Sequence, residues 1–110
     1  MSKFIEFKPK EEYAYYFRGL AKSYKGSYNE SIVDFTKAIE INSNVDYYYF
    51  FRGLANLNIV DYNGAISDYN KSIELNPNNA GAYYSRGLVK NYLQEYKSAL
   101  LYVDKASLIN

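Results

Sequence analysis

The six residues 15–20 read YYFRGL, and they recur as YFFRGL at residues 49–54 and as YYSRGL at residues 83–88. The spacing is 34 residues both times, and the flanking residues stay aligned without a gap. Between residues 12–45 and 46–79, 16 of the 34 aligned positions are identical. A fixed period of this length predicts a stack of similar supersecondary units.

Each unit has the apolar pattern of two helices. In the second unit, apolar residues recur at intervals of three and four from Tyr47 to Leu57 and nearly so from Tyr62 to Leu75, which is the spacing of one helical face. Proline and asparagine at residues 76–79 stop the second helix. We therefore predict no strand and six helices, near residues 9–25, 28–41, 46–59, 62–75, 80–93 and 96–109.

Composition favours a folded protein without a nucleic-acid or membrane partner. The 110 residues are 48% hydrophobic and 19% aromatic, which is enough apolar material for a core. The net charge is +1 without a long run of one sign, whereas nucleic-acid binders usually have a basic face. No segment has the length of a membrane span or the core of a signal peptide, so we expect a soluble, cytoplasmic protein.

The sequence has few of the side chains that usually carry catalysis. It contains no cysteine and no histidine, which excludes disulfides and the zinc and haem sites built on those ligands. Glu6, Glu11 and Glu12 form a weak carboxylate cluster at a helix N-terminus, where acidic residues favour the helix dipole. We therefore predict no enzyme, with no catalytic residue, no metal site and no cofactor.

The repeated unit resembles the tetratricopeptide repeat (TPR). The resemblance covers about residues 12–110 and rests on a combination of glycines, small residues, aromatics and one proline: Gly19, Gly53, Gly87, Ser31, Ala65, Ala99, Ala38, Ser72, Ala106, Phe35, Tyr69 and Pro77. We expect each glycine to face the small residue of its own unit, so that two antiparallel helices approach closely. The sequence departs from the family pattern before and three residues after the glycine: Arg18, Arg52 and Arg86, and Lys22, Asn56 and Lys90.

This resemblance implies an all-α fold, a right-handed superhelical α-solenoid of three helix-turn-helix hairpins. Residues 1–11 would form an N-terminal extension that runs into the first helix. The three repeats would occupy residues 12–45, 46–79 and 80–110, without a separate capping helix. Pro9 suits the first turn of the opening helix, where its missing N–H would be unpaired in any case.

The resemblance also implies a protein-protein interaction scaffold whose first helices form a concave groove. Because tyrosine and phenylalanine offer large contact areas with few rotatable bonds, an aromatic groove fits a peptide or a partner helix. The alternative is that many of these rings are ordinary core between the repeats. The predicted groove residues are Tyr13, Tyr16, Phe17, Leu20, Tyr24, Tyr47, Phe50, Phe51, Leu54, Asn58, Tyr84, Ser85, Leu88, Asn91 and Tyr92.

Two further expectations concern the partner. Chaperone-tail receptors of the family clamp a C-terminal carboxylate with lysine, asparagine and arginine, and the sequence lacks that clamp at the matching positions: Tyr16, Leu20, Phe51, Gly81 and Ser85. The second hypothesis is structural self-assembly. Arrays usually finish with a polar capping helix, and the apolar residues of the last predicted helix would be partly uncovered. The C-terminal edge would then join a second chain, or the array would continue.

The repeated arginines are expected to lie partly buried between helices, where an unpaired guanidinium would cost several kcal/mol. The repeating acids nearby are Asp34 and Asp68, and the third unit has Tyr102 at that position. Pairing within a unit would leave Arg86 without an acid. Pairing with the preceding unit would leave Arg18 at the N-terminal edge. We favour the second, because it leaves the spare charge where water can reach it.

Overall fold

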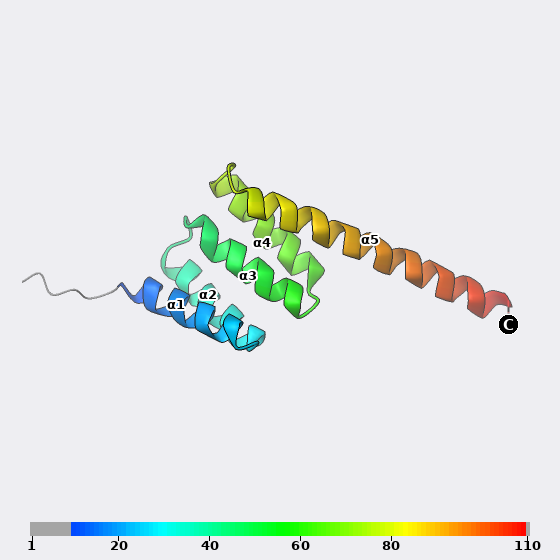
Figure 1. The fold of residues 1–110 in the computed structure, drawn as a ribbon, viewed down its shortest axis with the longest axis horizontal. Coiled ribbons are helices and arrows are strands. Elements are labelled where there is room, and N and C mark those ends of the chain that lie inside the picture. The colour runs from blue at the N-terminus through cyan, green and yellow to red at the C-terminus, as the bar shows by residue number, and fades with distance from the viewer. Residues whose placement is uncertain (1–9, 110) are drawn as a thin grey trace, which may run out of the picture.

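The computed structural model describes residues 10–109 as a row of helices without a strand (Figure 1). Its five helices are α1 (Glu11–Tyr24), α2 (Tyr28–Ile41), α3 (Asp46–Asn58), α4 (Tyr62–Leu75) and α5 (Ala80–Ile109). The prediction of an all-α solenoid of helical hairpins is therefore confirmed. Pro9 and most of the predicted N-terminal extension lie outside the described residues.

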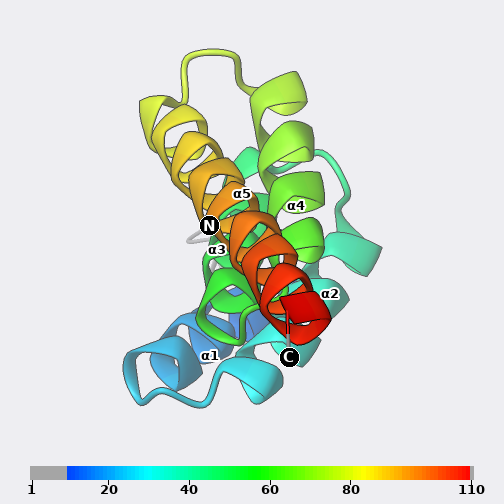
Figure 2. The same ribbon diagram turned by 90° about the vertical axis from the view of Figure 1, so that its right-hand side faces the viewer.

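The helices form two layers. α1 pairs with α2 and α3 pairs with α4, and the two hairpins stack because α2 also packs against α3. The first helices contact one another along the row, α1 with α3 and α3 with α5, which gives one layer. α2 and α4 form the other layer, as the turned view in Figure 2 shows.

The third hairpin is absent, so the prediction of six helices is wrong. α5 runs without a break through the residues predicted to turn. In the first two units the turn contains one residue with positive φ, Gly26 (84°) or Val60 (63°). The matching residue of the third unit is Gln94, which lies inside α5. Gln94 and Glu95 are good helix formers, and neither terminates a helix.

A helix-capping interaction also distinguishes the turn of the second unit from the continuous helix of the third. At the second turn, Asp61 Oδ1 accepts a hydrogen bond from the backbone N–H of Gly64 at 2.9 Å, which begins α4. The matching residue of the third unit is Glu95. Because glutamate is a poor N-cap and a good helix former, the chain continues as a single helix.

The repeated glycines allow close packing, but not against the residues that we expected. A Cβ added to Gly19 would lie 2.7 Å from Cε1 of Phe35, and one added to Gly53 would lie 2.7 Å from Cε1 of Tyr69. The glycine therefore accommodates the aromatic ring one turn after the small residue, and the small-residue prediction is wrong. At Gly87, no heavy atom of the described residues lies within 4 Å, because no second helix folds back over it.

The arginines pair within their own hairpin, so the pairing that we favoured is wrong. Arg18 Nε and Nη2 donate to the Asp34 carboxylate at 2.9 and 2.7 Å, and Arg52 donates to Asp68 at the same two distances. Both carboxylates are buried, whereas the side chain of Arg18 is 55% exposed and that of Arg52 is 22% exposed. The reason is geometric, because the arginine and the aspartate lie on the facing sides of one helix pair.

Among the described residues, the arginine of the third unit pairs with no acid, as the within-unit alternative implied. Arg86 Nη1 donates to Asn70 Oδ1 of the preceding unit at 2.9 Å. Arg52 reaches the preceding unit in the same way, where its Nη1 donates to Thr36 Oγ1 at 3.2 Å. The contact with the preceding unit is therefore a hydrogen bond to an uncharged acceptor, and the ion pair belongs to the hairpin.

The residues that depart from the family three positions after the glycine serve the same buried acids. Lys22 Nζ lies 3.1 Å from Asp34 Oδ2, and Asn56 Nδ2 donates to Asp68 Oδ2 at 2.9 Å. The hydrogen bonds from Arg18 lower the pKa of Asp34 below its usual value, although burial acts in the opposite direction. Each carboxylate is thus held by an arginine and one further donor.

Tyr69 contributes a buried hydroxyl that makes no hydrogen bond among the described residues. Burial raises its pKa to about 12; the Ser85 hydroxyl acts in the opposite direction without a well-formed hydrogen bond to the phenol. The first unit has Phe35 at the same position. Tyr69→Phe should therefore raise the free energy of unfolding by about 1 kcal/mol near neutral pH, because it removes an unsatisfied polar group.

The pH dependence of this variant provides a second measurement. A tyrosine whose folded pKa is raised stabilises the fold fully below its unfolded pKa near 10, and that stability is lost as the pH rises towards 12. The advantage of Tyr69→Phe over the natural chain should therefore grow across this interval in urea titrations. If the variant is less stable than the natural chain both near neutral pH and between pH 10 and 12, the Tyr69 hydroxyl has a hydrogen-bond partner in the folded state.

Candidate functional site

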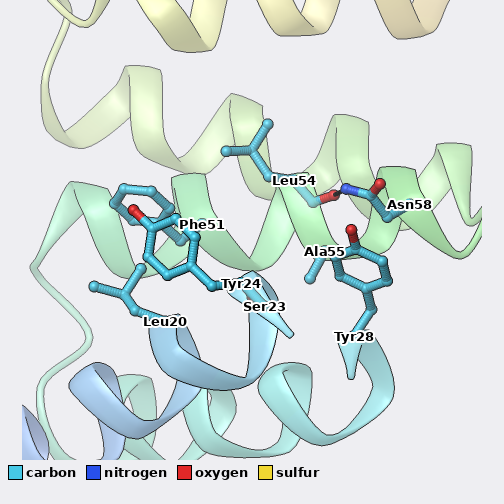
Figure 3. Close-up of a pocket in the computed structure, with 8 residues that line it drawn as sticks. All are labelled: Leu20, Ser23, Tyr24, Tyr28, Phe51, Leu54, Ala55 and Asn58. Carbon is cyan, nitrogen blue, oxygen red and sulfur yellow. Dashed lines mark hydrogen bonds between the residues drawn. The ribbon is translucent and has the colours of Figure 1, made fainter. Parts of the chain in front are cut away.

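A pocket of about 220 Å³ lies between α1, the start of α2 and α3 (Figure 3). It is lined by Leu20, Ser23, Tyr24, Tyr28, Phe51, Leu54, Ala55 and Asn58. Five of these were predicted as groove residues: Leu20, Tyr24, Phe51, Leu54 and Asn58. The helices contribute in the expected way, because the lining comes mainly from the first helices of two successive repeats.

The pocket combines apolar walls with a few hydrogen-bonding groups. Leu20 and Phe51 supply apolar surface from neighbouring helices (Figure 3). The side chain of Tyr24 is 90% exposed, so its ring and hydroxyl are accessible to a ligand. Asn58 Nδ2 donates to the backbone oxygen of Leu54 at 2.8 Å, which orients the amide. Ligand sites are commonly built this way, from apolar walls with few polar groups.

Beside the pocket, aromatic rings fill the contact between the first two repeats. The ring of Tyr16 lies 5.2 Å from Tyr47, 5.1 Å from Tyr48 and 6.0 Å from Phe51, measured between centroids. Tyr48 is fully buried and donates from its hydroxyl to Glu12 Oε2 at 2.7 Å. Burial, followed by this carboxylate, raises the pKa of Tyr48 well above its usual value. Glu12 therefore has a structural partner in the next repeat.

Phe50 belongs to the contact between the second repeat and α5. Its ring centroid lies 6.0 Å from that of Tyr69, and a Cβ added to Gly81 would lie 3.3 Å from its Cζ. Phe50 and Leu54 pack against the buried cluster of Ala65, Tyr69 and Val89. The interpretation of Phe50 as ordinary core between repeats accounts for these contacts.

The structure divides the predicted groove residues into three groups by exposure. The exposed ones are Tyr13, Phe17, Tyr24, Tyr47, Asn58, Tyr84, Asn91 and Tyr92. The half-buried ones are Tyr16, Leu20, Phe50, Phe51, Leu54 and Leu88. Ser85 is only 9% exposed, so little of its surface is accessible to a ligand. Ser85 and Ala82, three residues apart, are both buried on α5, which packs against α4.

The predicted groove residues of the third unit do not line the pocket between α1 and α3. Tyr84 is 73% exposed, and the ring of Tyr92 lies 6.1 Å from that of Tyr62. A second cavity, of about 300 Å³, lies where the turn between α3 and α4 approaches α5 at Leu93 and Tyr96. None of its lining residues was a predicted groove residue.

Sequence reasoning missed three residues of the main pocket, Ser23, Tyr28 and Ala55. Ser23 follows Leu20 by three positions and Ala55 adjoins Leu54, but small residues give no distinctive binding signal. Tyr28 begins α2, and its recurrence every 34 residues was interpreted only as part of the second-helix pattern. Its place at the hairpin turn, next to α3, could have indicated a contribution to the pocket.

Within residues 10–109, no group of three or more acidic side chains is arranged to hold a metal ion. In the same part of the chain, none of the helices combines the length and the apolar character needed to cross a bilayer.

Two family models match the sequence. A tetratricopeptide repeat model matches residues 12–45, and a TPR repeat model matches residues 61–91. No curated protein matches the sequence.

Solved structures show the same fold. The TPR domain of Arabidopsis OM64 is 27% identical, with a TM-score of 0.76, over 82% of this chain and 74% of that domain. The TPR2B domain of yeast Sti1, solved in a complex with pHsp70, is 26% identical, with a TM-score of 0.75, over 86% of this chain and 75% of that one. The second TPR of Spaghetti (RPAP3), 22% identical over 92% and 94% of the two chains, has a TM-score of 0.75 and supports the fold.

Proposed function

The chain belongs to the tetratricopeptide repeat family, and we propose that it binds a peptide or a partner helix through the face formed by α1 and α3. The observation that carries the proposal is the pocket of about 220 Å³, which brings together five predicted groove residues from two successive repeats. A pocket of this volume has room for one apolar side chain of a ligand. Such an anchor residue would be surrounded by α1, α2 and α3, and buried anchors of this kind carry most of the binding energy.

The exposed aromatic side chains near this pocket support the same proposal. Two exposed rings lie on α1: Tyr24, which lines the pocket and is 90% exposed, and Phe17, which does not line it and is 64% exposed. Such accessible rings, presented on rigid helices, lose little conformational entropy on binding. A ligand with one apolar anchor in the pocket and backbone contacts to the tyrosine hydroxyls and Asn58 fits this combination.

We propose that the ligand is recognised without a clamp on a terminal carboxylate. The yeast Sti1 domain was solved in a complex with pHsp70, and this complex of a relative supports a ligand bound by the repeats here. The positions that match the clamp carry Tyr16, Leu20, Phe51, Gly81 and Ser85. None of these side chains is cationic, so none of them can form an ion pair with a ligand carboxylate.

Tyr24→Ala should weaken a selected peptide by about 2 kcal/mol, or roughly 30-fold in Kd, if the ring closes over the anchor. Tyr84→Ala should have a similar effect only if the ligand extends to α5. The ligands would be selected from a displayed library of random peptides and measured by fluorescence anisotropy as synthetic peptides, with either a free or an amidated C-terminus.

Val33→Ala is the matched control, because Val33 is an exposed apolar residue on α2 in the other layer. It should leave affinity unchanged, and amidation of the peptide should too. Thermal unfolding of each variant separates loss of binding from loss of folding. The proposal fails if Tyr24→Ala binds as well as the natural chain, or if moderate salt alone abolishes binding.

A further inference from the structure

The C-terminal half of α5, residues 96–109, begins at Tyr96, which lines the second cavity beside the turn between α3 and α4, and then leaves the two hairpins. In Figure 1 it continues past the two hairpins, and a helix of 30 residues is about 45 Å long. Three apolar residues in it are exposed: Leu100 by 46%, Leu101 by 63% and Val103 by 60%. Contiguous exposed apolar surface of this kind marks an interaction site.

This segment has the pattern of a second helix of a repeat. Tyr96 and Ala99 stand 34 residues after Tyr62 and Ala65, which are on α4. In the two closed hairpins, these positions lie on helices that cover the repeated glycine of the first helix. The segment therefore matches a covering helix at Tyr96 and Ala99, although the position of the covering ring is Val103. Among the described residues, it leaves the glycine of its own unit uncovered.

The surface that such a helix would cover is present in the same molecule. Gly87 is exposed on α5, beside the exposed Tyr83 and Lys90. In the second hairpin, α4 covers the matching glycine, Gly53, with the ring of Tyr69. The unbroken course of α5 separates the two complementary surfaces along one helix, so they do not meet in the described residues of one chain.

We propose that a second copy of this chain supplies the missing helix, through a reciprocal exchange of residues 96–109. In the closed hairpin, a Cβ added to Gly53 would lie 3.3 Å from Cβ of Asp68. The matching positions of the third unit are Gly87 and Tyr102. These two positions are equidistant from the peptide bond between Gln94 and Glu95, the midpoint of the predicted turn.

That equidistance makes the surface self-complementary. When two copies of α5 lie antiparallel with their midpoints together, Gly87 of each copy faces position 102 of the other. Both contacts form at once, as a closed two-fold interface requires. Each copy thereby gains a third helix pair with the register of its own second hairpin. The proposal does not depend on the groove between α1 and α3.

A pair of cysteines tests this register directly, because the natural chain has none. The double variant Gly87→Cys, Tyr102→Cys places the two Cβ atoms within the range of a disulfide in the proposed interface. Under oxidising conditions we expect a covalent dimer on a non-reducing gel, and each single variant should form little of it. An intrachain disulfide would show a closed third hairpin and would overturn the proposal.

The natural chain and a turn variant complete the test. Light scattering of the natural chain should give twice the 12.8 kDa chain mass at high concentration. Gln94→Gly with Glu95→Asp restores the turn chemistry of the first two units, so the hairpin should close and the mass should fall to that of one chain. A natural chain that remains a monomer at every concentration overturns the exchange.

Discussion

Gly53→Leu is expected to lower the free energy of unfolding by about 1–3 kcal/mol or more, because it overpacks a filled contact. An added Cβ alone would lie 2.7 Å from Cε1 and 3.0 Å from Cδ1 of Tyr69. The ring is fully buried and packs in one cluster with Ala65 and Val89, so it has little room to move. Urea unfolding followed by circular dichroism measures the change.

Gly87→Leu is the matched control, since it makes the same substitution at the same repeat position. No heavy atom of the described residues lies within 4 Å of an added Cβ there. Leucine favours a helix interior over glycine by up to about 1 kcal/mol, so this variant should be as stable as the natural chain or more so. Both variants are to be measured at a concentration that gives the monomer mass. Equal stability at Gly53 and Gly87 would contradict the packing described for the second hairpin.

Asp68→Ala should cost about 3–5 kcal/mol, the second large effect, because it removes the partner of a buried charge. The carboxylate accepts two hydrogen bonds from Arg52 and one from Asn56, and the Arg52 side chain is 22% exposed. Without Asp68, the guanidinium keeps its hydrogen bond to Thr36 and its position over the Tyr49 ring, 5.7 Å from the centroid, but no opposite charge among the described contacts. Chemical unfolding of the variant provides the measurement.

The arginines of the other two units provide comparisons for the loss of stability in Asp68→Ala. Asp34→Ala should be milder, because the Arg18 side chain is 55% exposed and water can solvate it. In double-mutant cycles, Asp68 should couple to Arg52 and show little coupling to Arg86, which donates to Asn70 instead. Coupling of Asp68 to Arg86 that exceeds its coupling to Arg52 would reverse the pairing described above.

The sequence by itself determined the repeat, the helical class and the bounds of the first four helices to within one or two residues. Its period fixes which residues share a helical face, and turn residues mark where each helix ends. It also narrowed the arginine pairing to two arrangements. The sequence could not choose between them, because pairing within a unit and pairing with the preceding unit both follow the 34-residue period. Only the distances in the folded hairpins showed that Arg18 pairs with Asp34 and Arg52 with Asp68.

The candidate site was predicted only in part, for a related reason. Periodicity placed Leu20, Tyr24 and Phe51 on the correct faces, and these residues do line one pocket. It could not separate rings that fill the contact between repeats from rings that stay accessible. Phe50 and Tyr84 occupy the same position in their repeats, yet one packs on Tyr69 and the other is 73% exposed.

Only the tertiary structure decided the state of the third unit. Val60 adopts a positive φ that valine disfavours, which shows that packing of α4 on α3 can impose a turn on an unsuitable residue. At Gln94 the same strain is not imposed. Residues 96–109, which match the second helix of the closed hairpins, have Tyr102 and Val103 where those hairpins have a buried aspartate and a large ring. Gln94 and Glu95 favour a continuous helix, and in the structure no packing of residues 96–109 on residues 80–93 overcomes that preference.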